Sequence, residues 1–140
     1  MYPFYSSENL ENIKPVNKDY SYINDPYNLY LRLSAIWSKE TCAPRMANRW
    51  TKENKTLGQC SITSFLAQDI FGGDVYGIKL DDGNFHCYNM VDGVKFDLTS
   101  EQFEGRKLDY EDSSLQSREK HFSKEEKYRR YLKLKNNLSR

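Results

Sequence analysis

The sequence predicts an α+β domain in which a helix and flanking helices pack on an antiparallel sheet meander. Two segments show apolar residues at three- and four-residue steps, as amphipathic helices do. After a pair of glycines the period changes to two, and two Asp-Gly pairs divide that region into short strands. The 140 residues match the usual size of one domain. We therefore expect one domain over 25–140, preceded by an N-terminal strap over 1–24.

Composition and charge exclude several classes of protein. The 11 Tyr, 7 Phe and 2 Trp supply enough apolar surface for a core, which argues against a disordered chain. The 21 basic and 20 acidic residues nearly balance, so the net charge gives no reason to expect nucleic-acid binding. No uncharged segment is long enough to cross a membrane, and no signal peptide is recognisable. We expect a cytoplasmic protein that binds neither nucleic acid nor membranes.

The first helix is predicted over 26–39. The strap before it is polar and rich in tyrosine, without a sustained period, and indicates an extended or partly mobile arm. Asp25 is a good N-cap residue, and Pro26 after it suits the first helical position. The apolar positions that define this helix are Leu29, Leu33, Ile36 and Trp37.

A long loop and a second helix follow. Residues 40–57 show neither period and predict a loop anchored by Trp50; loops of this length are often functional. Residues 61–71 carry an apolar face, and the glycine pair after them ends the helix. This spacing places Cys60 at the amino end of the second helix.

The three strands allow a register to be predicted. They span residues 75–80, 84–91 and 94–99. If both Asp-Gly turns are two-residue loops, Cys87 lies opposite Ile78 in the first hairpin and opposite Leu98 in the second, on an apolar face. His86 and Asp97 then share the polar face as diagonal neighbours, which lie roughly 7–8 Å apart. An imidazole and a carboxylate can meet across that separation.

A last helix is predicted over about 124–138. Ser123 and Glu126 have the spacing of a capping box, and the basic side chains that follow are favoured near a helix carboxyl end. We interpret the basic stretch 124–140 as a solvated helix face, with an acidic-partner site as the alternative. His121, which precedes the capping box among charged residues, is expected to be exposed.

Cys60, His86 and Asp97 form the candidate catalytic group. The amino end of a helix lowers the pKa of a thiol, and its free amides can hold an oxyanion. His86 would take and return the proton, while Asp97 would fix the imidazole tautomer and stabilise its charged form. These residue types in this order predict nucleophilic catalysis by a thiol.

Simpler interpretations exist for each residue of this group. A cysteine at a helix start is often only a small buried apolar residue, and a single histidine on a sheet is usually structural. A metal site formed by Cys60, His86 and Cys87 is disfavoured because adjacent strand residues point to opposite faces. The sequence contains no phosphate-binding loop, dinucleotide-binding motif or zincin motif. We therefore expect neither a metal nor a cofactor.

Four sequence blocks resemble the YunG-like family of small bacterial proteins, which has no established activity. The blocks are Leu57-Gly-Gln-Cys60, Leu66-Ala-Gln-Asp-Ile-Phe-Gly-Gly73, His86-Cys-Tyr-Asn89 and Phe96-Asp-Leu-Thr-Ser-Glu-Gln-Phe103. The likeness covers the core of the domain, residues 37–103. More distantly, the arrangement is similar to the papain-like and transglutaminase-like fold. That resemblance implies a papain-like architecture with Cys60 as nucleophile, His86 as base and Asp97 as orienting group.

Function is predicted from this group and from that resemblance. We expect an acyl-group enzyme (amidase, peptidase, deamidase or acyltransferase) that acts on an amide or acyl substrate, such as a peptide, through a Cys60 thioester. The sequence departs from the papain pattern in having no separate oxyanion glutamine. Gln59, Asn54 and Trp50 are the candidates for oxyanion binding or substrate positioning. The alternative is a non-catalytic binding or regulatory module on the same scaffold.

Overall fold

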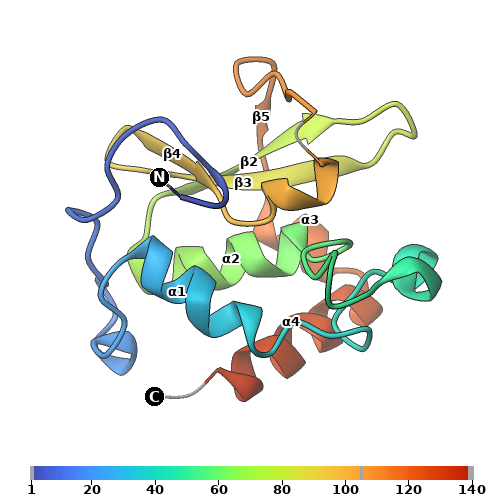
Figure 1. Ribbon diagram of the computed structural model, residues 1–140, viewed down its shortest axis with the longest axis horizontal. Helices are drawn as coiled ribbons and strands as arrows, with labels where there is room; N and C mark the ends of the chain where they lie inside the picture. The colour runs from blue at the N-terminus through green and yellow to red at the C-terminus, as the bar shows by residue number, and fades with distance from the viewer. Residues whose placement is uncertain (1, 105, 139–140) are drawn as a thin grey trace.

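The computed structural model, which describes residues 2–104 and 106–138, shows an α+β domain (Figure 1). Residues 1, 105 and 139–140, which belong to the predicted strap, domain and basic segment, lie outside the described part. The strands are β1 (Tyr5–Ser6), β2 (Asp74–Lys79), β3 (Phe85–Val91), β4 (Val94–Asp97) and β5 (Ser114–Leu115). The α-helices are α1 (Pro26–Ser34), α2 (Cys60–Phe71), α3 (Arg118–Phe122) and α4 (Glu125–Asn137), and the 3₁₀ helices are η1 (Lys18–Tyr20), η2 (Pro44–Arg49) and η3 (Ser100–Phe103).

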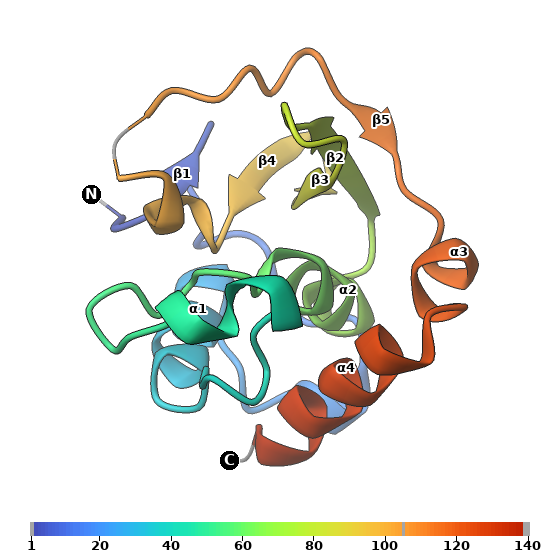
Figure 2. The same ribbon diagram turned by 90° about the vertical axis from the view of Figure 1, so that its right-hand side faces the viewer.

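The sheet has five antiparallel strands in the order β1-β4-β3-β2-β5. Helices α1, α2 and α4 lie on one side of it, and α2 packs on β3 while α4 packs against α2 (Figure 1). Figure 2 shows the chain leaving β5 at the sheet edge and entering α3 and α4. The α+β class and the antiparallel meander are thus confirmed. No helix within the described ranges is long and apolar enough to span a bilayer.

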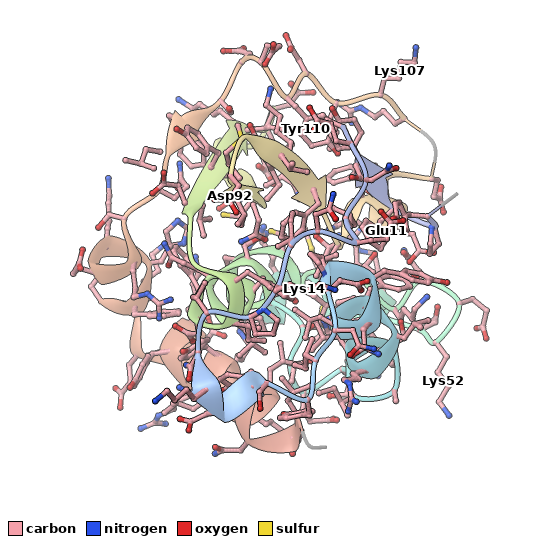
Figure 3. The ribbon with its side chains drawn as sticks, turned by 90° about the vertical axis from the view of Figure 1, so that its left-hand side faces the viewer. Glu11, Lys14, Lys52, Asp92, Lys107 and Tyr110 are labelled. Atoms are coloured by element: carbon pink, nitrogen blue, oxygen red, sulfur yellow. The ribbon has the colours of Figure 1, made fainter. Side chains whose placement is uncertain are left out.

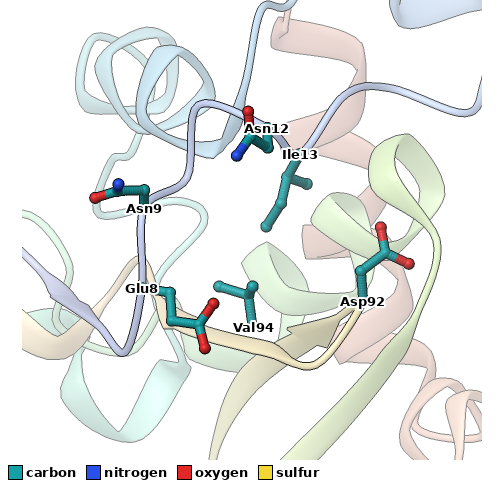
Figure 4. A pocket seen from close by; sticks show the side chains of 6 residues that line it. All are labelled: Glu8, Asn9, Asn12, Ile13, Asp92 and Val94. Atoms are coloured by element: carbon teal, nitrogen blue, oxygen red, sulfur yellow. The ribbon is translucent and has the colours of Figure 1, made fainter.

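The N-terminal strap is ordered along the body of the domain. It contributes the edge strand β1, and its apolar side chains join the core. Those side chains are Phe4, Leu10, Ile13, Tyr20 and Ile23. Where the strap passes the turn between β3 and β4, it forms a cavity of about 480 Å³ lined by polar and apolar residues (Figure 4), namely Glu8, Asn9, Asn12, Ile13, Asp92 and Val94. The extended strap is therefore a structural part of the sheet edge.

Helix α1 begins as predicted but ends five residues early. The Asp25 carboxylate accepts a hydrogen bond from the Asn28 amide at 2.8 Å, which caps the helix. After Ser34 the chain turns, and the Trp37 indole donates to Thr63 Oγ1 of α2 at 2.9 Å. Trp37 has the spacing of a helical apolar residue in the sequence, but in the structure it lies beyond the end of α1 and forms this buried hydrogen bond instead. The prediction of helix 26–39 is wrong over its last turn.

The predicted register of the first hairpin is wrong by one residue. The loop contains three residues, because the Leu80 amide donates to the Asn84 carbonyl and Gly83 adopts a left-handed φ of 86°. Asp-Gly suits this longer loop as well as the two-residue turn. His86 therefore lies opposite Ile78, and Cys87 lies opposite Gly77.

This shift exchanges the two faces of β2, so the side chains that face the core are not the predicted ones. Val75 is in the core, whereas Tyr76 stacks on Tyr88 on the opposite face with ring centroids 6.1 Å apart. A one-residue slip exchanges the two faces of a strand, so the prediction that Ile78 shares the apolar face of Cys87 is also wrong. The second hairpin has the predicted two-residue turn, with positive φ at Asp92 and Gly93 and with Val91 opposite Val94.

The predicted capping box does not cap the last helix. The Ser123 hydroxyl donates backward to the Lys120 carbonyl at 2.7 Å, because Ser123 is the C-cap of α3. Helix α4 starts after Lys124, which makes no side-chain cap. The short helix α3 was not predicted. It carries His121, which is half-buried and hydrogen-bonded, contrary to the expectation that this histidine is exposed.

Candidate active site

Cys60 is the first residue of α2 and is half-buried. The turn before it depends on Gly58, which has a φ of 71°. A Cβ at this position would lie 2.6 Å from Cys42 Sγ and 2.9 Å from the Ala43 amide nitrogen. A side chain at residue 58 is therefore excluded both by the backbone conformation and by the space available. This glycine allows the chain to deliver the thiol to the helix start.

The backbone amides at the start of α2 are available to a ligand. The side chain of the N-cap residue Gln59 makes no capping hydrogen bond. The first intrahelical bond is from the Thr63 amide to the Gln59 carbonyl, so within the described part of the chain the amides of residues 60–62 have no hydrogen-bond acceptor. Unpaired amides and the helix dipole favour an anion here.

His86 and Asp97 form a buried pair at the same end of the sheet as Cys60. Residue 86 is near the start of β3 and residue 97 ends the neighbouring strand β4, so both reach the end where α2 begins. His86 Nε2 donates to Asp97 Oδ2 at 2.6 Å, and both side chains are almost completely buried. Cys60 Sγ lies 3.8 Å from the carbonyl oxygen of Phe85, the residue before His86. The sequence-predicted group is therefore assembled at one place.

Asp97 is held by three further hydrogen bonds. The Thr99 amide and hydroxyl donate to Oδ1 at 3.2 and 3.4 Å. The Tyr110 hydroxyl donates to Oδ2 at 2.7 Å. Tyr110 was not recognised from the sequence, because it lies in an irregular segment beyond the sheet and its spacing carries no signal. These bonds fix the carboxylate so that it orients the imidazole.

The other ring nitrogen of His86 is free. Nδ1 is buried and has no hydrogen-bond partner among the described residues, although the ring edge-packs on Phe103 at 4.6 Å between centroids. Buried polar atoms are normally satisfied, so an unpaired nitrogen beside a thiol indicates a functional position. Nε2 is occupied by Asp97, which leaves Nδ1 as the nitrogen for proton exchange with Cys60 or a ligand.

The electrostatics of the site favour a charged pair. Burial lowers the pKa of His86, but the Asp97 charge and hydrogen bond outweigh burial and raise it to about 10. The neighbouring Cys87 thiol and the His86 charge, opposed by burial, lower the pKa of Cys60 well below its usual value of 9.0. Both shifts favour the ion pair of a Cys60 thiolate and a His86 imidazolium over the neutral pair.

Cys87 is a second thiol in this site that the sequence reasoning missed. It lies on the core face of β3 and is 1% exposed, as predicted for an apolar position. The neighbouring Cys60 thiol, together with burial, raises the pKa of Cys87 well above 9.0. The opposite shifts of the two thiols favour ionisation of Cys60 over ionisation of Cys87. The sequence predicted the apolar face of residue 87 but not that α2 packs on that face.

His121 and Lys127 form a further polar group near the two thiols. Lys127 Nζ lies 2.9 Å from His121 Nδ1, and His121 Nε2 lies 2.8 Å from Gln116 Oε1. Burial first, and then the Lys127 charge, lower the pKa of His121 to about 4, so His121 is neutral at pH 7. The charge of Lys127 interacts favourably with the thiolate of Cys60.

The three residues predicted to bind an oxyanion or position substrate are not brought together with Cys60 by their side chains. Gln59 Nε2 donates to the Ser38 carbonyl at 3.0 Å, and its buried Oε1 has no partner among the described residues. The Trp50 indole donates to the Lys55 carbonyl at 2.9 Å within its own loop. The Asn54 amide closes a turn onto Thr51. The free amides of α2 are better placed for an oxyanion.

Comparison with known proteins places the chain in a family. The family model described as YunG protein matches residues 25–140. The chain belongs to the YunG family. It is also 38% identical over 72 residues to "Uncharacterized protein YunG" of Bacillus subtilis (strain 168), an alignment that spans 51% of this chain and 57% of that protein. The chain thus covers little more than half of this relative. No solved structure matches.

Metal binding receives no support from the site geometry. Within residues 2–104 and 106–138, no group of three or more His, Cys, Asp or Glu side chains is arranged to hold a metal ion. The buried histidine has one nitrogen occupied by a carboxylate, and the Cys87 thiol is held protonated. The arrangement suits proton transfer and thiol chemistry.

Removing the Cys87 thiol is expected to weaken the ionisation of Cys60. In Cys87→Ala the neighbouring thiol that lowers the pKa of Cys60 is removed, so the pKa of Cys60 should rise. The rate of iodoacetamide labelling of Cys60, followed between pH 5 and 8 by mass spectrometry, measures this change. The pH midpoint should move upward in Cys87→Ala and stay in place in Cys42→Ala. An unchanged midpoint in Cys87→Ala would show that the two thiols are uncoupled.

The pKa shifts also predict how stability depends on pH. The pKa of His86 is raised from 6.5 to about 10, so the stability it contributes is complete below pH 6.5 and is lost as the pH rises towards 10. The pKa of Cys60 is lowered from 9.0, so the stability it contributes is complete above pH 9.0 and is lost as the pH falls through its folded-state pKa. The two groups therefore act in opposite directions as the pH changes.

The Cys60→Ala variant exposes the contribution of His86. Its unfolding free energy, relative to that of the wild type, should fall from pH 6.5 upward by at most about 1.4 kcal/mol per pH unit. Urea unfolding at pH 6, 7, 8 and 9 measures the difference between the two proteins. A difference that does not vary with pH would contradict the lowered pKa of Cys60.

Proposed function

We propose that this protein is a cysteine-dependent acyl-group enzyme with a papain-like arrangement of Cys60, His86 and Asp97. One observation carries the proposal: the buried His86–Asp97 hydrogen bond lies at the sheet end where the half-buried Cys60 begins α2. Structural histidines rarely combine a carboxylate partner, an unpaired second nitrogen and an adjacent thiol of lowered pKa.

In the first half of the proposed reaction, the Cys60 thiolate attacks the carbonyl carbon of an amide or other acyl compound. A carbon–sulfur bond forms, and the carbonyl oxygen becomes an oxyanion held by the free amides at the start of α2. The His86 imidazolium gives its Nδ1 proton to the leaving nitrogen as the carbon–nitrogen bond breaks. A thioester and a neutral imidazole remain.

In the second half, His86 Nδ1 takes a proton from water or from an acceptor amine that attacks the thioester. The carbon–sulfur bond breaks, the acyl product leaves and the thiolate–imidazolium pair is restored. Asp97 stays ionised throughout and stabilises the imidazolium through the 2.6 Å hydrogen bond. If water attacks the thioester the protein is a hydrolase, and if an amine attacks it the protein is an acyltransferase.

Labelling with electrophilic acyl probes tests the proposal. The folded protein is treated with thiol-selective electrophilic probes, such as a peptide vinyl sulfone and an acyloxymethyl ketone. The modified residue is then identified by mass spectrometry. Cys60 should react first, and Cys42 and Cys87 should remain unmodified. A panel of p-nitroanilide and glutamine-amide substrates then measures turnover. A Cys60 that reacts no faster than Cys42 would favour the non-catalytic module.

A further inference from the structure

A second cavity adjoins the edge strand β1. It has a volume of about 610 Å³, within the usual range for small-molecule sites. One wall is the start of the strap, and the other is formed by η3 and the segment that follows it. Its aromatic lining comes from Tyr2, Phe4, Tyr5 and Tyr110. Cys60 does not line this cavity, so it is distinct from the place where the thiol would react.

The charges that line the cavity are positive once internal pairs are counted. Its acidic residue, Glu101, accepts a hydrogen bond from the Tyr30 hydroxyl and pairs with Lys55 at 3.4 Å. Arg106 and Lys107 are exposed at the cavity, and within the described part of the chain neither side chain forms a hydrogen bond or an ion pair. Two cations beside an aromatic wall suit an anionic group attached to an apolar body.

Tyr110 connects this cavity to the buried pair. Its ring stacks on Tyr5 with centroids 4.0 Å apart, and both rings line the cavity. Its hydroxyl donates to the same Asp97 oxygen that accepts from His86. Figure 3 shows Tyr110 beside the N-terminal strap, with Lys107 farther along the same outer segment. A molecule that contacts this ring therefore contacts a hydrogen-bond partner of Asp97.

We propose that this cavity binds a molecule with a carboxylate or phosphate group on an aromatic body, and that its occupancy alters the Asp97–His86 pair through Tyr110. Arg106 and Lys107 hold the anionic group, and the tyrosine wall holds the ring. The binding half of this inference is independent of catalysis. The second half requires only the thiol reactivity of Cys60, which is measurable without a known substrate.

Calorimetric titration of the full chain tests the binding half. The probes are phenylacetate, phenyl phosphate and the neutral phenylacetamide, and protein NMR locates the shifts of the cavity residues. Either anionic probe should bind about tenfold or more tightly than phenylacetamide, because a charged hydrogen bond is lost in the amide. Comparing phenylacetate with phenyl phosphate distinguishes a carboxylate ligand from a phosphate ligand.

Two variants distinguish binding in this cavity from a general effect of surface charge. The double variant Arg106→Gln, Lys107→Gln should lose the preference for the anionic probes, while Lys52→Gln should keep it. Lys52 is an exposed lysine in the loop after η2, away from Lys107 in Figure 3. Equal binding of neutral and anionic probes by the wild type, or an unchanged preference in the double variant, would overturn the binding proposal.

The coupling half is tested by the labelling rate of Cys60 at pH 6.5. A saturating anionic probe should change the wild-type rate about fivefold, at the low end of usual coupling between sites. Tyr110→Phe keeps the ring in the cavity but removes the hydroxyl, so it should bind the probe and show no rate change. The coupling would be refuted if the bound probe left the wild-type labelling rate of Cys60 unchanged, or if it changed the rate in Tyr110→Phe as much as in the wild type.

Discussion

Replacing Cys60 by alanine is expected to remove at least about 10³-fold of any acyl-transfer activity, because the nucleophile that forms the thioester is lost. The start of α2 and its free amides remain, so the variant should still fold. The measurement is turnover of the substrate found in the amide panel, together with probe labelling. Catalysis that survives in Cys60→Ala would exclude the thioester mechanism.

Cys42→Ala is the matched control for this prediction. Cys42 is 2% exposed and packs against Gly58, and burial raises the pKa of its thiol. It should therefore be unreactive, and its loss should leave turnover intact. The labelling rate of Cys60 should also persist below pH 7, where an unperturbed thiol is almost fully protonated. A rate that follows an ordinary thiol pKa would contradict the thiolate–imidazolium pair.

The second large effect is expected for Asp97→Asn, with a loss of roughly 10²–10⁴-fold in turnover. Asparagine keeps the shape of the side chain but removes the charge that raises the pKa of His86 to about 10. The imidazole should then lose its proton nearer to pH 6.5, and the thiolate should lose its partner at neutral pH. Turnover against pH should fall off on the alkaline side at a lower pH than in the wild type.

Asp92→Asn is the control for the Asp97 variant. Asp92 is exposed in the tight turn between β3 and β4 with a φ of 52°, a conformation that asparagine also tolerates. Activity and stability should therefore stay close to wild type. Urea unfolding of both variants shows whether Asp97→Asn lowers turnover more than it lowers the folded fraction. A loss of activity that simply follows unfolding would make Asp97 a structural residue.

The pairing of His86 with Asp97 was predictable because it depends on a local turn. Asp92-Gly93 has two residues with positive φ, and such a turn aligns β3 with β4. The start of α2 at Cys60 was equally accessible from helix periodicity and the glycine pair after it. These features are encoded within short segments, where backbone sterics and hydrophobic period act directly.

The first hairpin shows the limit of this reasoning. Asp-Gly is compatible with two-residue and three-residue loops, and the choice was made by which residues of β2 the core buries. Val75 faces the core and Gly77 lies opposite Cys87 only in the observed register. The Gln116 side chain also fills the space over Gly77 from a distant part of the chain. Packing of that kind has no local sequence signal.

The sequence by itself determined the α+β class, the helix that begins at Cys60 and the shared strand face of His86 and Asp97. Each of these depends on turn chemistry or periodicity over a few residues. Only the tertiary structure decided that Cys87 influences Cys60 and that Tyr110 holds Asp97. These contacts join segments that are distant in the chain, and burial of the core, rather than local conformation, brings them together.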